Sequence, residues 1–249
     1  MVHHEIIGDD MQAVVLTLGQ GDAVRAEAGA MMYMTDGITM DAKMDGGLLG
    51  GLKRKLFAGE SFFITHFRCE RPSGRIAFAG PHPGKIIAMP LAAQGVLCQK
   101  DAFLCAQGDI DISIAFTKRI GAGFFGGEGF VLQKLEGTGL AFIHAGGTVV
   151  EMALAPGETI KVDTGCLVAF DPAVSYEIAR VGGIKTSLFG GEGLFFAAMT
   201  GPGRVWLQTL PFSRLADRIN QAFKGDRGET KRDMGGLLGG LGNVIGGDK

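Results

Sequence analysis

Apolar and polar residues alternate along several short stretches of the chain. The clearest is residues 109–116 (DIDISIAF), where three isoleucines and a phenylalanine fall on every second position. Residues 158–163 and 175–180 follow the same period. Because side chains on a strand point alternately to opposite faces, each stretch predicts a strand with one buried face.

A single amphipathic helix is predicted near the C-terminal end. Over residues 213–223, Leu215, Ile219 and Phe223 recur at every fourth position, after Pro211 and Ser213, which suit a helix start. We expect this apolar stripe to pack on the β-body. Beyond it, residues 224–249 form a polar linker and a Gly/Leu-rich tail, which we expect to be flexible.

A much longer pattern occurs three times. Its marker is Phe-x-Gly-Glu followed by apolar residues, and it contains Glu60, Glu128 and Glu192 in turn. Upstream of the first marker, residues 18–31 align without gaps on two later stretches, and each copy reads as strand, tight turn and strand. The spacing is about the size of one small structural unit, which predicts a triplicated domain. The two later stretches are residues 91–104 and 154–167.

The repeats account for most of the chain. They cover about residues 18–80, 91–146 and 154–210, and with the helix at 213–223 they form one predicted domain over residues 1–223. The sequence therefore predicts an all-β fold of three repeated units with a C-terminal helix and a flexible tail. A residue kept in all three copies is more typical of a folding role than of chemistry, which needs only one site.

Composition supports many short strands joined by turns. Glycine supplies 42 of 249 residues, and 46% of the chain is hydrophobic, which is enough for a sizeable core. The net charge of −2 gives no reason to expect a nucleic-acid partner, because phosphate binding needs a basic surface. The N-terminus lacks a signal-peptide pattern, and we expect free thiols at the four cysteines in a reducing cytoplasm. These are Cys69, Cys98, Cys105 and Cys166.

Candidate chemistry is sparse. Glu60, Glu128 and Glu192 allow two interpretations: a ring on a pseudo-threefold axis that binds a hard cation, or turns in which each carboxylate accepts backbone N–H bonds. We favour the turns, and expect a Glu128→Gln or Glu192→Gln variant to lose only about 1 kcal/mol of stability. Asp109 and Asp111 fit a solvated strand face better than an acid/base pair.

Other motifs predict no catalytic, cofactor or metal site. Residues 121–126 satisfy G-x-G-x-x-G, but they run into an apparent strand rather than a helix, so we do not assign a nucleotide site. The five histidines show no metal-ligand spacing apart from adjacent His3 and His4, near an end expected to be mobile. No nucleophile motif occurs. We therefore expect a protein without catalytic residues or cofactors.

Two Gly/Leu-rich segments stand apart from the repeat pattern. One interpretation is a hairpin connection and a disordered tail, and the other is contact with a protein partner or a membrane surface, since leucine beside lysine and arginine suits an interfacial segment. The candidate contact residues are Leu48, Leu49, Leu52, the basic triplet Lys53, Arg54 and Lys55, and in the tail Leu237, Leu238 and Leu241.

These motifs resemble a known family. Residues 28–34 (AGAMMYM), the GGLLGGLKR run at 46–54 and the marker at 57–63, together with residues 188–194, look like the bacterial branch of the altered-inheritance-of-mitochondria family. The similarity covers about residues 1–210. It implies repeated β-units similar to the tryptophan RNA-binding attenuation protein, a short double-stranded β-helix relative, with pseudo-threefold symmetry. It brings no catalytic residues, and it implies a membrane-associated scaffolding role.

Taken together, these patterns predict a cytoplasmic, non-enzymatic binding or scaffold protein, peripheral at the membrane where the Gly/Leu segments touch it. Its partner is an unknown protein or a membrane surface, and a homo-oligomer fits the same interpretation. A small-molecule or sugar-binding β-protein is the alternative, including a cupin-like enzyme, although clustered histidines are missing. An RNA-binding ring rests on fold analogy alone.

Overall fold

The computed structural model describes residues 2–43, 64–91, 94–118, 130–180 and 195–223. It divides into two compact units, Met1–Pro211 and Phe212–Lys249. The described residues of the first unit form antiparallel strands joined by turns, and the second unit begins with a helix at residues 212–223. The predicted all-β body and C-terminal helix are therefore confirmed.

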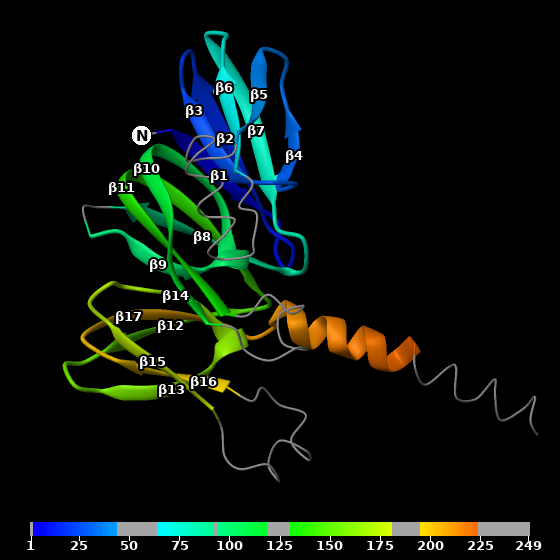
Figure 1. The fold of residues 1–249 in the computed structure, drawn as a ribbon. Helices are drawn as coiled ribbons and strands as arrows, with labels where there is room; N and C mark the ends of the chain where they lie inside the picture. Colours follow the sequence, from blue (N-terminus) through cyan, green and yellow to red (C-terminus); the bar gives the residue numbers. More distant parts are fainter. Residues whose placement is uncertain (1, 44–63, 92–93, 119–129, 181–194, 224–249) are drawn as a thin grey trace, which may run out of the picture. The chain divides into compact units, whose positions relative to one another are not determined.

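The β-unit has three successive sections, at residues 13–79, 84–146 and 149–208. Figure 1 shows the second section between the other two. The first section follows an N-terminal strand, β1 (His3–Ile7), and consists of β2 (Ala13–Gly19), β3 (Ala23–Glu27), β4 (Met31–Met34), β5 (Ile38–Lys43), β6 (Ile64–Cys69) and β7 (Ser73–Ala79). The second consists of β8 (Gly84–Leu91), β9 (Val96–Gln99), η1 (Lys100–Ala102), β10 (Phe103–Lys118) and β11 (Phe130–Gly146). The third consists of β12 (Val149–Leu154), β13 (Thr159–Asp163), η3 (Thr164–Cys166), β14 (Leu167–Phe170), β15 (Ser175–Arg180), β16 (Phe195–Thr200) and β17 (Gly203–Gln208).

The strands pair in a similar order in each section. In the first, β7 lies between β2 and β4, and β6 pairs with β3 and β5. In the third, β17 lies between β12 and β14, and β16 pairs with β13 and β15. In the second, the long β11 takes the places of both central strands. Its second half lies between β8 and the start of β10, and its first half pairs with β9 and the end of β10.

Glycine permits the long β10–β11 hairpin to bend where it passes from one role to the other. Gly108 and Gly137 have φ of +111° and +122°, in the region that L side chains rarely adopt. A Cβ on Gly137 would lie 2.0 Å from the Asp109 carbonyl oxygen. The close approach of the two backbones therefore requires glycine here.

Three apolar clusters form the core, one associated mainly with each section. Phe67, Phe78 and Phe142 are fully buried in the first cluster, and Phe130 and Phe170 in the third. The predicted alternation is confirmed in β10, where Ile110 and Ile112 are buried and Asp109 and Asp111 are exposed. The strands predicted over 158–163 and 175–180 are β13 and β15.

One local expectation was wrong. The N-terminal residues expected to be mobile form β1, which pairs with β2 from His3↔Thr17 to Ile7↔Ala13. The packing of the helix stripe on the β-body remains a prediction.

Candidate functional site

The residues singled out from the sequence lie outside the described part of the chain. These are the repeated glutamates Glu60, Glu128 and Glu192, the G-x-G-x-x-G stretch at 121–126, and the candidate contact residues Leu48, Leu49, Leu52, Lys53, Arg54, Lys55, Leu237, Leu238 and Leu241. Their roles remain predictions. The described strands present a different candidate, which sequence reasoning missed.

Neighbouring sections are joined by pairing between a strand of one section and a strand of the next. At the first junction β3 pairs with β10, and at the second β9 pairs with β14. In each case the second strand of one section pairs with the third strand of the next section. Both junctions extend one continuous sheet through all three sections.

This arrangement leaves one strand of each kind without a second neighbour. β4 is the counterpart of the start of β10 and of β14, but among the described strands it pairs only with β7. β13 is the counterpart of β3 and β9, but among the strands described it pairs only with β16. Figure 1 shows β4 in the first section and β13 in the third, with the second section between them.

Other edge strands in the described chain differ from these two. β5, β12 and β15 also end their sheets. Among the described strands, their counterparts in the second section, the end of β10 and β8, pair with no strand of another section. β5, β12 and β15 are thus of kinds that lie at a sheet edge in the second section too. The strands that correspond to β4 and β13 in other sections, by contrast, form junctions.

Two of the four side chains on β4 are apolar and exposed. Met32 is 59% and Tyr33 38% exposed. Met32 occupies the same bulge position as Leu104 on β10 and Val168 on β14, the two strands that form junctions, and those two residues are no more than 2% exposed. An exposed apolar edge with free backbone N–H and C=O groups is a site at which another strand can add.

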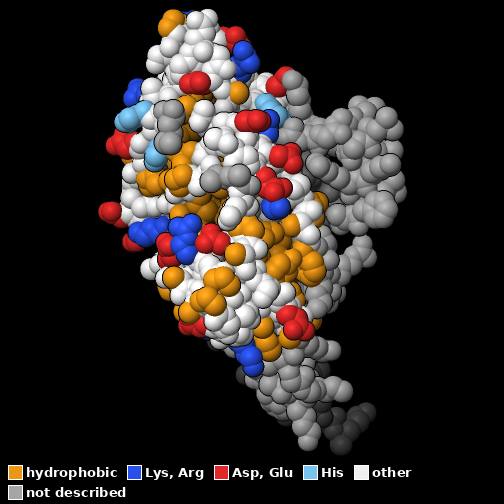
Figure 2. Space-filling model, turned by 90° about the vertical axis from the view of Figure 1, so that its left-hand side faces the viewer, with side chains coloured by type: hydrophobic (Ala, Val, Ile, Leu, Met, Phe, Trp, Pro, Cys, Tyr) orange, Lys and Arg blue, Asp and Glu red, His pale blue; other side chains and the backbone are white. Residues whose placement is uncertain are grey.

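Positive and negative side chains are mixed on one face of the described surface. On the face drawn in Figure 2, the described Lys and Arg side chains are interspersed with Asp and Glu. Several of these charges are paired, for example Arg71 with Asp36 at 2.6 Å and Lys134 with Glu136 at 2.6 Å. No helix among the described residues is long and apolar enough to span a membrane.

A polar group at η1 contains a carboxyl with an unusual pKa. The pKa of Glu27, at the end of β3, is raised to about 7, chiefly by burial and next by the charge of Asp101, while Lys100 opposes the shift. Gln99 Nε2 donates to Asp101 Oδ2 at 3.3 Å, and Gln133 Nε2 donates to the Lys100 carbonyl at 3.4 Å. Glu27 can therefore exchange a proton near neutral pH.

Two histidines distant in the sequence meet between β8 and β11. The ring centroids of His82 and His144 are 4.6 Å apart in an edge-to-face contact. His144 is 4% exposed, and its pKa is lowered to about 4, first by burial and then by the charge of His82. The sequence signal was the backbone room at Gly80 and Gly84, whose Cβ positions the His144 ring occupies. The described residues contain no group of three or more His, Cys, Asp or Glu side chains able to hold a metal ion.

The cysteines behave as the sequence predicted. None of the four forms a disulfide; Cys69, Cys98 and Cys105 are buried and Cys166 is partly buried. Burial raises the pKa of the Cys98 thiol to about 12 and that of Cys105 well above its usual value. These thiols are packing groups rather than nucleophiles, because the thiolate is the reactive form.

Comparisons with known proteins agree with one another. The chain is 28% identical over 215 residues to an uncharacterized protein of Streptococcus pyogenes serotype M6, covering 84% of this chain and 85% of that protein. It also matches the crystal structure of a Streptococcus pyogenes protein with a TM-score of 0.75 and 26% identity, covering 89% of this chain and all of the other. The model of the family described as mitochondrial biogenesis AIM24 matches residues 4–210. The chain therefore belongs to the AIM24 family, in agreement with the resemblance seen in its repeats.

Proposed function

We propose that this protein is a non-catalytic binding and assembly protein that contacts its partners through unpaired strand edges. One observation carries the proposal: Met32 and Tyr33 on β4 are exposed, whereas the residues in the same positions of β10 and β14 are buried at junctions between sections. Burying a methionine side chain stabilises a complex by about 1.5–3 kcal/mol. Leaving this edge open is therefore costly unless a partner covers it.

The proposal includes a threefold repetition of one β-unit, similar to the tryptophan RNA-binding attenuation protein fold. The shared pairing order supports it, as does an irregularity in register at the same place in each section, between Met31 and Tyr33, Phe103 and Cys105, and Leu167 and Ala169. Bulges of this kind belong to the design of a fold. The described pairings run in a row, first to second and second to third, so a closed pseudo-threefold arrangement would require β13 to meet β4.

Membrane association belongs to the same proposal, with support from the sequence alone. The Gly/Leu segments place leucines beside the basic triplet, a combination that suits the surface of an anionic membrane. In this view the β-body assembles and the Gly/Leu segments bring the assembly to the lipid surface.

Crosslinking in cells tests the edge. The full-length wild type is compared with Met32→Lys on β4 and with Met40→Lys on β5, since Met40 is also an exposed methionine on an edge strand. We expect Met32→Lys to lose most crosslinked species and Met40→Lys to retain them, because only β4 has counterparts that form junctions. Retention of the same crosslinked species by Met32→Lys would refute the proposed function.

A further inference from the structure

We propose that the edge of β4 is filled by β13 of a second copy of this chain, so that copies assemble head to tail. This inference rests on the proposed function and names the partner. It follows from the fact that the two open edges are complementary: β13 is the kind of strand that each section offers to the next, and β4 is the kind that receives it.

Both internal junctions use one register. At the first, Cys105 lies opposite Ala26. At the second, Ala169 lies opposite Cys98. Cys105 and Ala169 each follow the bulge of their strand directly. Ala26 and Cys98 each lie two residues after a valine, Val24 or Val96, and are buried with it in the core cluster of their own section. A single pairing rule thus generates both junctions, and it can be applied once more.

Applied to the open edges, the rule gives a defined intermolecular register. Tyr33 follows the bulge of β4 as Cys105 and Ala169 follow theirs, and Val162 is the counterpart of Ala26 and Cys98. Val162 of one copy therefore lies opposite Tyr33 of the next. The neighbouring pair in the same antiparallel register is Lys161 opposite Met34.

Burial supports this assignment on the β13 side as well. Ile160 corresponds to Val24 and Val96, the residues two before Ala26 and Cys98. Those two residues are buried, whereas Ile160 is only partly buried. The same position is therefore incompletely covered on β13, as expected of a junction strand that lacks its neighbour.

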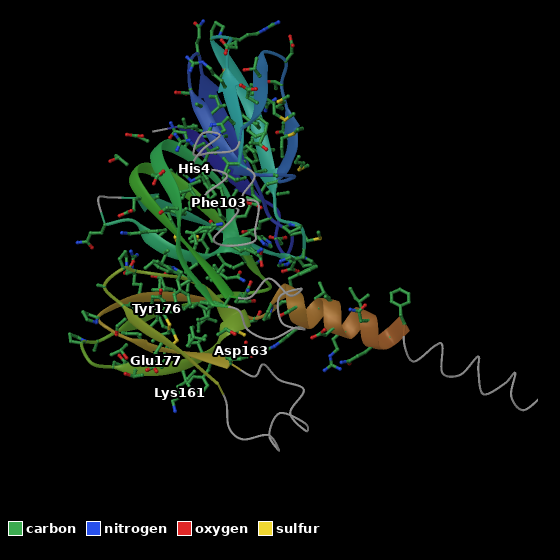
Figure 3. All side chains as sticks on the ribbon, in the orientation of Figure 1. His4, Phe103, Lys161, Asp163, Tyr176 and Glu177 are labelled. Carbon is green, nitrogen blue, oxygen red and sulfur yellow. The ribbon has the colours of Figure 1, made fainter. Side chains whose placement is uncertain are left out.

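A cation at the position of Lys161 is compatible with a formed junction. Lysine on an edge often discourages pairing, but Arg25, its counterpart, lies in the first junction, where its Nη1 donates to the Ile110 carbonyl of the next section. The exposed Lys161 side chain, labelled in Figure 3, has its Nζ 5.3 Å from the Phe196 ring centroid. Its ammonium is exposed on β13, and its stem is long enough to make the contact that Arg25 makes.

The contact has the form of a heterologous interface, because different surfaces of the two copies meet. Such an interface leaves a free β4 at one end and a free β13 at the other, so repetition produces a ring or a filament. A symmetric dimer, in which β4 meets β4, is the arrangement that this inference excludes.

Cysteine crosslinking of the full-length chain tests the register. Met34→Cys and Lys161→Cys are introduced on separate chains that also carry Cys166→Ser, because the remaining cysteines are buried. Under mild oxidation we expect a covalent dimer from the mixture and little from either variant alone. Thr159→Cys replaces Lys161→Cys as the control, since it lies two residues away on the same strand face. The control mixture should crosslink at least about fivefold more slowly, because diagonal Cβ atoms are about 7–8 Å apart and a disulfide needs about 4 Å.

Light scattering over a concentration series completes the test. We expect a mass above the 26.1 kDa of one chain, reduced to one chain by Met32→Lys but not by Met40→Lys. Three results would overturn the inference: a monomer at every concentration, equal crosslinking by Lys161→Cys and Thr159→Cys, or a dimer from Met34→Cys alone as fast as from the mixture. If the in-cell crosslinks that Met32→Lys abolishes contain only other proteins, binding through the β4 edge is supported and a second copy as the partner is refuted.

Discussion

Replacing His144 by glutamine should remove a large part of the protein's sensitivity to acid. The His144 ring is buried against the backbone of Gly80 and lies beside His82. Burial and the His82 charge lower its pKa from 6.5 to about 4. The folded state therefore binds a proton less readily than the unfolded chain does, so stability is full above pH 6.5 and falls as the pH decreases toward 4.

The magnitude follows from the two pKa values. Between pH 7.5 and pH 5.0, a histidine with a pKa of 6.5 unfolded and about 4 folded reduces the free energy of unfolding by about 2 kcal/mol. Glutamine does not titrate, so the loss of stability between these pH values should be about 2 kcal/mol smaller in His144→Gln than in the wild type. Denaturant unfolding at the two pH values, followed by circular dichroism, measures this difference.

Two controls isolate His144. In an NMR titration its imidazole signals should shift with a midpoint near pH 4. His82→Gln removes the neighbouring charge and should raise that midpoint. Identical pH dependence of unfolding in the wild type and His144→Gln would refute the reasoning, because the buried ring would then titrate as it does in the unfolded chain.

Three further predictions test other parts of the molecule. The pKa of Glu27 is raised to about 7, so its stabilising effect is full below pH 4.5 and is lost as the pH rises through 7. Between pH 5 and pH 8 the wild type should therefore lose about 2 kcal/mol more unfolding free energy than Glu27→Gln does. The same pH dependence of unfolding in the two proteins would contradict this. Gly137→Ala should cost roughly 3 kcal/mol or more because of its backbone clash, whereas Gly157→Ala, with positive φ but open space, should cost about 1 kcal/mol; similar melting temperatures for the two variants would disagree with the structure. Truncation after Phe223 should leave the melting temperature nearly unchanged but reduce salt-sensitive flotation with anionic liposomes; equal flotation of the truncated and full-length proteins would exclude the tail from membrane contact.

Many of the strands and turns could be predicted because the two-residue period and the glycine turns are local signals. The tight turn after Leu18 appears as Gly21 with φ of +87°, and its counterpart Gly157 has φ of +78°. Where the period was clear, as at Ile110 and Ile112, both the strand and its buried face followed. These features depend only on neighbouring residues, which one sequence displays.

The candidate site could not be predicted because it depends on pairing between distant strands. Residues 31–34 read as an ordinary apolar strand, and nothing in them indicates that β4 lacks the second neighbour that β14 has. His82 and His144 meet because β11 pairs with β8, with His144 opposite Ile86. A one-residue change in that register would point the imidazole to the other face of the sheet.

The open edges follow from the way that the sections are joined. Each junction pairs the second strand of one section with the third strand of the next. A row of sections of any length therefore ends with one unpaired third strand and one unpaired second strand. Evolved edges that must stay open are usually protected by charge or proline, but β4 consists of three methionines and a tyrosine. Its sequence is instead that of a strand meant to be covered. β3 and β9, the strands that correspond to β13, each pair with a strand that corresponds to β4. β13 is therefore the strand suited to cover β4.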